Sequence, residues 1–459
     1  MSEEFKTIIG LEIHAQLKTK SKMFCSCSND AENEAPNTLV CPICLGLPGT
    51  LPVANKQAIE YVCKIGLALE SRLVKLSWFD RKHYFYPDLP KGYQISQYQK
   101  PFCEGGELEV GGKKVRINRV HLEEDAGKLI HSDGGMSYVD LNRAGTPLAE
   151  IVTEPDIESP AQAKDFMKEL RELLRSIGVS DADMEKGHLR CDANISVVKS
   201  EKGKIKSSPI VEIKNLNSFK FVEKSLAIEE KRLREDFDSW PKKQTKVTRG
   251  FDSKNNKTYQ LREKEESKDY RYFPEPDIPP IELHELFDLE KIKSELGKLP
   301  SCSRSELEEI GLDEQTAKVV MQDKKILNQI SLLKEKGVSI SHKLIKTLIN
   351  EKTTREFSAE QLEDLAVLLE KGIPSNILRL LIYEAQDQGK LPSEFYEEDS
   401  TDIEAIVEEV LRKNNDAASK YKSGKTEVIG FLIGEAMKLS KGKSDPSTIR
   451  EKIIKKLKD

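Results

Sequence analysis

Alternating apolar and polar residues predict several β-strands with one polar face in the first two-thirds of the chain. Successive side chains of a strand point to opposite faces, so every second residue shares a surface. Segment 8–17 places Ile9, Leu11 and Ile13 on one face and Glu12, His14 and Gln16 on the other. Segment 189–197 has an apolar face, and its polar face carries His188, Arg190, Asp192, Asn194 and Ser196.

Two further segments extend this pattern. Within 116–125 one face carries Arg119, His121, Glu123 and Asp125, and Glu124 lies on the other; Glu150 belongs to a predicted strand at 147–152. A single polar strand face usually marks the wetted side of an antiparallel sheet. Several faces rich in Glu, His, Arg and Asp predict a sheet whose open side lines a cleft with metal ligands and phosphate-binding arginines.

Helical periodicity appears in two places of this first part and dominates from residue 295 onward. The first helix begins after Ser159, a suitable N-cap; Pro160 suits its first turn and Gly178 can end it. A second helix is expected from Ser218 to Phe237. Segment 242–269 predicts a hairpin or mobile loop, and 270–280, with four prolines, can form neither helix nor central strand. We therefore predict an α+β fold, with a mixed-sheet domain at 1–294, an all-α domain at 295–399 and a small helical tail at 400–459.

Composition narrows the class. The chain has 459 residues, of which 37% are hydrophobic and 33% charged, as in a soluble globular protein. No apolar run approaches the ~20 residues that cross a bilayer, and the acidic N-terminus has no apolar core, so we expect a cytoplasmic protein without a membrane contact. Residues 412–459 carry a charge of +7, although the whole chain carries −5. This basic tail indicates either a polyanion partner or an ordinary lysine-rich helix surface.

Two groups of residues suggest metal chemistry. Glu123, Glu124 and Asp125 are consecutive acids, which repel one another unless a cation or solvent compensates them; a solvated acidic loop and a magnesium–nucleotide site are both open. The second group is two cysteine pairs separated by 13 residues, which predict a structural zinc knuckle near 25–44, although iron, disulfides or free thiols also fit the spacing. Its four cysteines are Cys25, Cys27, Cys41 and Cys44.

Several common motifs are absent from the sequence. Gly424-Lys-Thr426 imitates the end of a phosphate-binding loop, but Ser419 occupies the position of its first glycine. No Rossmann fingerprint and no hydrolase nucleophile elbow is present. If ATP binds, it must bind through metals and a sheet cleft, as in carboxylate-activating ligases, and ammonia would have to come from elsewhere.

These blocks of sequence resemble a known family along essentially the whole chain. The blocks at 9–20, 86–97, 121–128, 140–147, 189–196 and 270–277 are similar, in the same order, to blocks of the B subunit of bacterial-type aspartyl/glutamyl-tRNA(Asn/Gln) amidotransferase. The resemblance implies a glutamine-synthetase-like cradle, a helical domain and a small tRNA-binding tail. It also implies ATP-dependent phosphorylation of glutamate or aspartate misacylated onto tRNA, followed by amidation with ammonia. That ammonia derives from glutamine and is channelled from a partner amidase.

The resemblance further implies ligands and partners. ATP and magnesium are the expected cofactors, with zinc as a structural addition. Expected partners are the amidase (glutaminase) and the small third protein of the same complex, the misacylated tRNA and the cognate aminoacyl-tRNA synthetase. Two other interpretations stay open: a tRNA-holding scaffold with a purely structural acidic cleft, and a stand-alone amide ligase for a free acid. The preference between Glu-tRNA and Asp-tRNA is also open.

Specific roles follow for the polar residues as expectations. The magnesium shell is assigned to Glu12, His14, Glu124 and Glu150. Alternation puts Glu123 and Asp125 on the opposite face from Glu124, so which of these three acids binds metal is left open. Glu123 and Asp125 are also expected to take part in catalysis. Asp192 is expected to bind a second magnesium or to orient ammonia. Candidates for contacts to ATP or acyl-phosphate oxygens are Lys128, Arg143 and Arg190.

Overall fold

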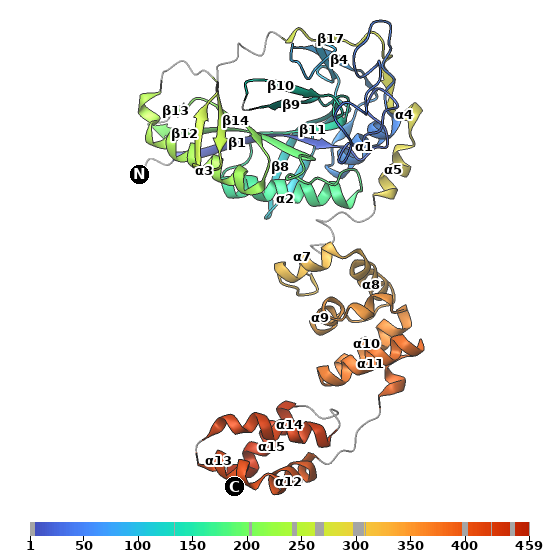
Figure 1. The fold of residues 1–459 in the computed structure, drawn as a ribbon, viewed down its shortest axis with the longest axis vertical. Helices are drawn as coiled ribbons and strands as arrows, with labels where there is room; N and C mark the ends of the chain where they lie inside the picture. Colours follow the sequence, from blue (N-terminus) through green and yellow to red (C-terminus); the bar gives the residue numbers. More distant parts are fainter. Residues whose placement is uncertain are drawn as a thin grey trace. The chain divides into compact units, whose positions relative to one another are not determined.

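The computed structural model describes residues 5–132, 134–201, 204–240, 246–261, 270–296, 307, 309–396, 403–423, 425–440 and 446–458. The chain forms two compact units, Met1–Ser301 and Cys302–Asp459. The first is mixed α/β and contains a large mixed sheet; the described part of the second is helical (Figure 1). The mixed sheet and the helical C-terminal region agree with the pattern-based prediction.

The large sheet has eleven strands, antiparallel except where β14 runs parallel to β15. Its long central strands bring segments from distant parts of the sequence side by side. The order is β16 (Lys257–Gln260), β15 (Val247–Asp252), β14 (Val211–Leu216), β12 (Leu189–Glu201), β1 (Phe5–Gln16), β11 (Pro147–Thr153), β8 (Lys113–Glu124), β6 (Cys103–Glu104) and β2 (Arg72–Leu73); β13 (Lys204–Ser207) pairs with β12 and β7 (Glu107–Val110) with β8.

Within the described residues, short strands form three small sheets beside the large one. The prolines of 270–280 confine that segment to a two-residue edge strand, in agreement with its predicted exclusion from central positions. The expected hairpin within 242–269 is present as β15 and β16, and the remainder of that segment lies partly outside the described residues. The small sheets are β9 (Lys128–His131) with β10 (Ser137–Asp140), β17 (Phe273–Pro274) with β4 (Asp80–His83) and β5 (Tyr93–Ser96), and β18 (Ile281–Glu282) with β3 (Leu76–Ser77).

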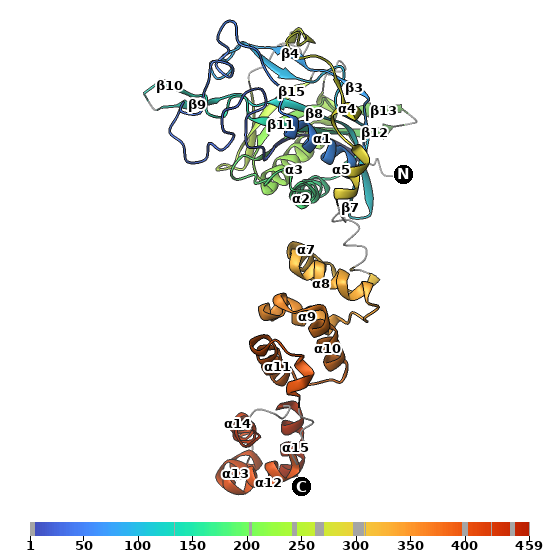
Figure 2. The same ribbon diagram turned by 90° about the vertical axis from the view of Figure 1, so that its right-hand side faces the viewer.

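Helices cover one face of the large sheet and leave the other face to the site (Figures 1 and 2). In α2 the Ser159 hydroxyl accepts from the Gln162 N–H, Pro160 opens the helix, and Gly178 follows its end with a φ of 73°, as the sequence predicted. The Ser218 cap likewise begins the second predicted helix, α3. The helices of this unit are α1 (Lys56–Ala68), α2 (Pro160–Ser176), α3 (Phe219–Glu235), α4 (Leu283–Leu286) and α5 (Leu289–Glu295).

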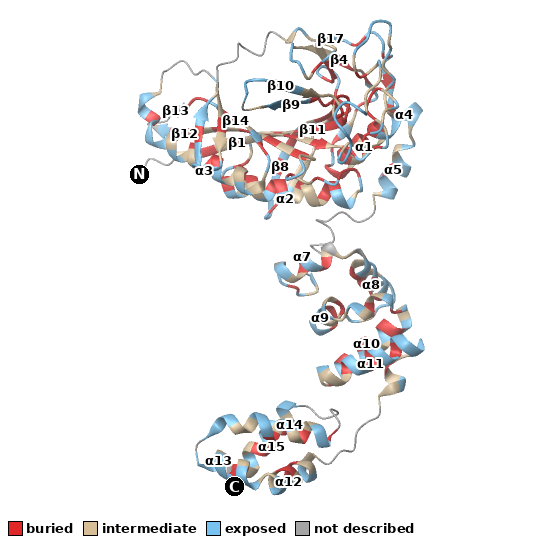
Figure 3. Ribbon diagram, in the orientation of Figure 1, coloured by how far each residue is buried: buried red, intermediate tan, exposed pale blue. Residues whose placement is uncertain are grey.

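The core of the first unit lies between these helices and the apolar sheet face (Figure 3). Ile9 and Ile13 of β1 and Phe166 and Leu170 of α2 are fully buried. Each such side chain contributes about 1.5–3 kcal/mol on burial. This packing fixes which face of β1 points away from the helices, and it is the face that carries Glu12 and His14.

The described part of the second unit contains two hydrophobic clusters, one on either side of residues 397–402. The first cluster packs α7 (Glu314–Gln322), α8 (Lys324–Glu335), α9 (His342–Asn350), α10 (Ala359–Glu370) and α11 (Ser375–Gln388). The second packs α12 (Ile403–Lys413), α13 (Asn415–Lys422), α14 (Ile429–Leu439) and α15 (Pro446–Lys458). No described helix is long and apolar enough to cross a membrane.

Candidate functional site

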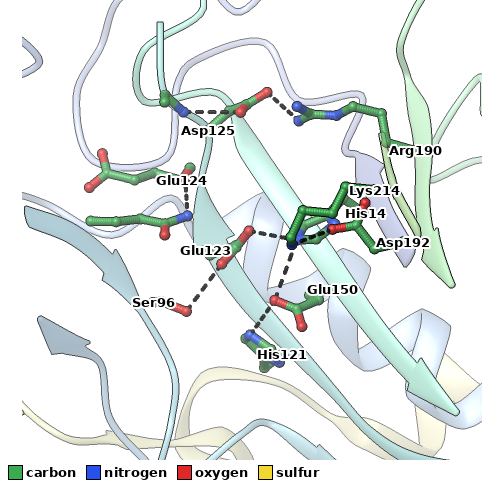
Figure 4. Close-up of polar contacts among 12 residues, drawn as sticks. His14, Ser96, His121, Glu123, Glu124, Asp125, Glu150, Arg190, Asp192 and Lys214 are labelled. Atoms are coloured by element: carbon green, nitrogen blue, oxygen red, sulfur yellow. Dashed lines mark hydrogen bonds and ion pairs between the residues drawn. The ribbon is translucent and has the colours of Figure 1, made fainter. Parts of the chain in front are cut away.

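Three neighbouring strands bring acids and histidines together on the open face of the large sheet. Glu150 of β11 stands opposite His14 of β1 and opposite His121 of β8. Because directly paired residues share a face, the three side chains meet. The Glu150 carboxylate lies 3.5 Å from His14 Nε2 and 3.1 Å from His121 Nε2 (Figure 4).

Glu123 and Glu12 complete this arrangement, which we call the acid–histidine cluster: Glu12, His14, His121, Glu123 and Glu150. The Glu123 carboxylate lies 3.2 Å from His14 Nε2 and accepts from the Ser96 hydroxyl at 3.3 Å. Possible ligand atoms of Glu12, His14 and Glu150 all lie within 4.8 Å of one another, as do those of His121, Glu123 and Glu150. Three carboxylates and two imidazoles in this small volume suit a divalent cation, with oxygen the favoured donor for magnesium.

The pKa values of the cluster reflect crowded acids. Burial alone lowers the pKa of His14, but hydrogen bonds and charges of Glu123 and Glu150 hold it well above its usual range. Burial raises the pKa of Glu150, yet His121 and His14 hold it well below its usual value. Burial and the charge of Glu150 raise the pKa of Glu12. Protonated His14 thus balances the acids when no metal does, and a bound cation competes with that proton.

Glu124 lies outside the cluster, so the structure does not bring it together with the other residues predicted for the magnesium shell. Strand alternation turns its side chain to the opposite side of β8 from Glu123 (Figure 4). There the carboxylate accepts from the Lys91 ammonium and, at 2.9 Å, from the Ile95 N–H. The acid of the consecutive run that joins Glu12, His14 and Glu150 is Glu123.

Asp125 holds two predicted arginines at one end of the cluster. Its carboxylate accepts from Arg190 at 2.6 Å and lies 3.3 Å from Arg143 Nε. Arg143 also donates to the Ala126 and Gly127 carbonyls, at 3.1 and 2.7 Å. Since Arg190 is paired directly with His14 across β1 and β12, these guanidinium groups border the cluster. Such donors suit phosphate or carboxylate oxygens.

Asp192 and Lys128 occupy different surroundings. Asp192 stands opposite Glu12, accepts from Lys214 Nζ at 3.0 Å and from the Asn215 N–H at 2.7 Å, and so is held beside the cluster. Lys128 begins the β9–β10 sheet and is exposed. Its ammonium makes no hydrogen bond or ion pair with the cluster in the described part of the chain, so the structure does not bring it together with the other predicted residues.

The four cysteines of the predicted knuckle do converge. Their sulfur atoms all lie within 4.8 Å of one another, and Cys41 and Cys44 Sγ are 3.8 Å apart. Tetrahedral zinc with bonds of about 2.3 Å requires sulfur–sulfur distances of about 3.8 Å. A hydrogen bond from the Cys25 thiol lowers the pKa of Cys44 to about 5. The donor set and its spacing therefore fit a structural metal.

The knuckle is joined to the loop that carries Arg143. The fully buried Lys22 ammonium donates to the Leu39 carbonyl at 2.7 Å and to the Leu141 carbonyl at 3.4 Å, and lies 3.9 Å from Cys44 Sγ. Asn142 adds two bonds, donating to the Ala35 carbonyl at 2.7 Å and accepting from the Leu39 N–H at 2.9 Å. These contacts hold residues 139–145 against the cysteine segment, so a well-ordered knuckle keeps the loop of Arg143 in place.

Comparison with protein-family models gives two matches. Residues 7–287 match the GatB/GatE catalytic domain and residues 315–457 match the GatB domain. The B subunits of the aspartyl/glutamyl-tRNA(Asn/Gln) amidotransferases of Thermotoga maritima and Persephonella marina are each 44% identical to this chain over 482 residues, with 99% of each chain covered. The corresponding protein of Thermodesulfovibrio yellowstonii is 44% identical over 480 residues, covering 99% of this chain and 100% of that protein.

The chain belongs to the amidotransferase B-subunit family. The resemblance inferred from the sequence blocks is thereby confirmed. The catalytic-domain match spans the whole open face described above, from β1 to β16, and the second match lies in the helical unit.

Sequence reasoning gave no role to three residues of this site. His121 was placed on the polar face of its strand, and its pairing with Glu150 depends on register that local sequence does not reveal. Lys82 comes from the separate sheet that contains β4 and β5. Burial lowers the pKa of its ammonium, but the charges of Glu123 and Glu150 outweigh this effect, so the pKa lies above its ordinary value. Lys214 approaches from β14, where Asp192 and Glu212 likewise raise its pKa despite burial. Alternation within Val211–Leu216 was an available signal for Lys214, whereas the all-polar strand Asp80–His83 offers no such signal for Lys82.

Proposed function

We propose that this chain is the kinase and amidation component of a glutamine-dependent tRNA amidotransferase, a carbon–nitrogen ligase. Its substrates are glutamate on tRNA(Gln), aspartate on tRNA(Asn), or both. The family membership and the acid–histidine cluster on the open sheet face support this function. Separate amidation assays of Glu-tRNA and Asp-tRNA, with the chain co-expressed with its partner proteins, test the substrate preference.

The proposed chemistry has two steps. An oxygen of the substrate side-chain carboxylate attacks the γ-phosphorus of ATP, and ADP leaves with the bond electrons. Ammonia then attacks the activated carbonyl carbon; phosphate departs with the carboxylate oxygen, and a proton passes from the attacking nitrogen to a base. The first step is required because a free carboxylate is a poor electrophile, and it needs the charge of the transferring phosphoryl group neutralised.

The cluster and its neighbours divide this work. Glu12, His14, Glu123 and Glu150, with His121, would hold magnesium, which supplies charge neutralisation at the phosphates. Arg190 and Arg143, oriented by Asp125, would contact phosphoryl or carboxylate oxygens. Asp192, held by Lys214, would bind a second magnesium or orient ammonia. Lys128 would need a movement of β9 and β10 to reach the same oxygens.

We further propose the architecture expected from the sequence: a glutamine-synthetase-like cradle at 1–294 with structural zinc on its four cysteines, a helical domain at 295–399 and a basic tRNA-binding tail at 400–459. The +7 charge of residues 412–459 supports the last assignment. Since the sequence contains no amidase nucleophile motif, ammonia comes from a partner amidase (glutaminase). This amidase and a small third protein complete the proposed heterotrimer, which acts in the cytoplasm and receives tRNA from the cognate synthetase.

The observation that carries this proposal is the convergence of Glu12, His14, Glu123 and Glu150 from three strands. The decisive test measures ATP hydrolysis by the assembled enzyme with and without misacylated tRNA. Stimulation by misacylated tRNA, lost in Glu150→Gln, is expected. Normal turnover in that variant would instead favour a scaffold with a structural acidic cleft. Full activity after deletion of residues 412–459 would favour a stand-alone ligase.

A further inference from the structure

Lys22 is fully buried beside the cysteine knuckle, although its side chain ends in an ammonium group. Burying a charge is costly unless an opposite charge and hydrogen bonds compensate it. In the described part of the chain no carboxylate pairs with this ammonium, which donates to the Leu39 and Leu141 carbonyls. Lys91, which also lies beside the knuckle, differs because it pairs with Glu124. The charge of Lys22 must therefore be balanced by something other than an acid.

The sulfur cluster can supply that balance. Lys22 Nζ lies 3.9 Å from Cys44 Sγ, and the Cys41 N–H donates to the same sulfur at 3.1 Å. Both donors suit a thiolate sulfur, which is the form that binds a metal. Four thiolates around a divalent cation leave two negative charges uncompensated. The buried ammonium places one positive charge directly beside such a centre, where groups around the ligands tune a metal.

The same lysine also contacts the loop at 139–145. A Cβ on Gly145 would lie 3.5 Å from Lys22 Cδ and 3.8 Å from Cys44 Cβ, so the loop packs on both residues. The Gly145 N–H donates to the Asp125 carbonyl at 2.9 Å. The Asp125 carboxylate holds the two arginines that border the acid–histidine cluster. A continuous series of contacts thus runs from the knuckle to those arginines.

Resting on the structural zinc of the proposed function, we propose that Lys22 is the counter-ion of the zinc–thiolate centre and a positioning residue for the loop at 139–145. Its ammonium stabilises the negative metal centre. Its bonds to the Leu39 carbonyl in the knuckle and the Leu141 carbonyl in the loop tie the two segments together. Zinc binding and order of the loop are therefore coupled, and each strengthens the other. With four protein ligands the zinc itself does no chemistry.

Lys22→Met tests the proposal in the full-length chain, because it keeps the length of the side chain and removes the charge. Zinc affinity, measured by competition with a chromophoric chelator, should fall by about tenfold or more, as expected for a lost hydrogen bond to a charged group. With cobalt in place of zinc, the thiolate-to-cobalt absorption band should move to longer wavelength, because no positive charge then lowers the energy of the sulfur lone pairs. Amide hydrogen exchange at 139–145 in the zinc-loaded variant should accelerate by about tenfold.

Lys20→Met, at an exposed position two residues away, is the matched control and should leave all three measurements unchanged. Unchanged zinc affinity in Lys22→Met would overturn the proposal. Weaker affinity with an unmoved cobalt band would also overturn it, because the lysine would then only fill space beside the knuckle.

A measurement on the unaltered chain covers the case in which Lys22→Met does not fold. An amine-reactive reagent should modify Lys22 at least about tenfold more slowly in the zinc-loaded chain than after chelation, whereas Lys20 should react equally in both. Equal rates at Lys22 would overturn the proposal. An unaltered chain that binds no zinc would contradict the structural zinc itself, whereas zinc bound normally by Lys22→Met contradicts only the role of Lys22.

Discussion

The adjacent acids Glu123 and Glu124 form a matched pair that tests the geometry of the metal site. They follow one another on β8 but face opposite sides, the first toward His14 at 3.2 Å and the second toward Lys91. Glu123→Gln removes a charged ligand from the proposed magnesium site. A hydrogen bond to a charged group contributes about 1.5–3 kcal/mol. We therefore expect magnesium affinity to fall by about 10- to 150-fold.

Glu124→Gln removes the same charge one residue away and is the control. Because its carboxylate points to the other side of the strand, its magnesium affinity should stay within about a factor of three of the original. Calorimetric titration of the full-length chain with magnesium, in the presence of ATP, measures both variants. Equal weakening in the two variants, or weakening only in Glu124→Gln, would refute the assignment of Glu123.

Three further predictions follow from other contacts. Because the raised pKa of His14 keeps it protonated in the metal-free chain, magnesium binding must release a proton, so affinity should rise with pH up to that pKa and then level off. Calorimetry in two buffers of different ionisation enthalpy counts the proton, and a pH-independent affinity would contradict this reasoning. Cys25→Ser should abolish zinc binding, measured by metal analysis, and accelerate amide hydrogen exchange in residues 139–145; unchanged exchange there would argue against the contacts through Lys22. Glu229→Ala should lower the free energy of unfolding by about 3–5 kcal/mol, because the fully buried carboxylate pairs with Arg249 at 2.9 Å. The exposed Glu235→Ala on the same helix should change it by less than about 1 kcal/mol in the same denaturant titration.

Strand alternation predicted much of the site because it is a local property. The polar faces of β1, β12 and β8 were placed correctly from segments of about ten residues, since each strand has one face against the helices. The same alternation separated Glu123 from Glu124. To decide which of the two acids lies with Glu150 and the histidines, one needs the pairing of β8 with β11, which sets Glu150 beside His121.

Other parts of the site depend on long-range contacts that local patterns do not contain. Lys82 lies in a four-residue strand of a different sheet, and its approach to Glu123 follows from packing between sheets. The contacts of Asn142 with Ala35 and Leu39 join loops more than a hundred residues apart. The cysteine pairs were recognisable because their spacing itself encodes the convergence of the four sulfur atoms.

The central claim is that this chain activates the side-chain carboxylate of the esterified amino acid by phosphorylation. Glutamyl-tRNA labelled with oxygen-18 in that carboxylate tests it most directly, in the assembled enzyme with ATP and glutamine. One labelled oxygen should appear in each inorganic phosphate released, because the oxygen that attacks the γ-phosphorus leaves with it. Amidated product accompanied by unlabelled phosphate would contradict the account.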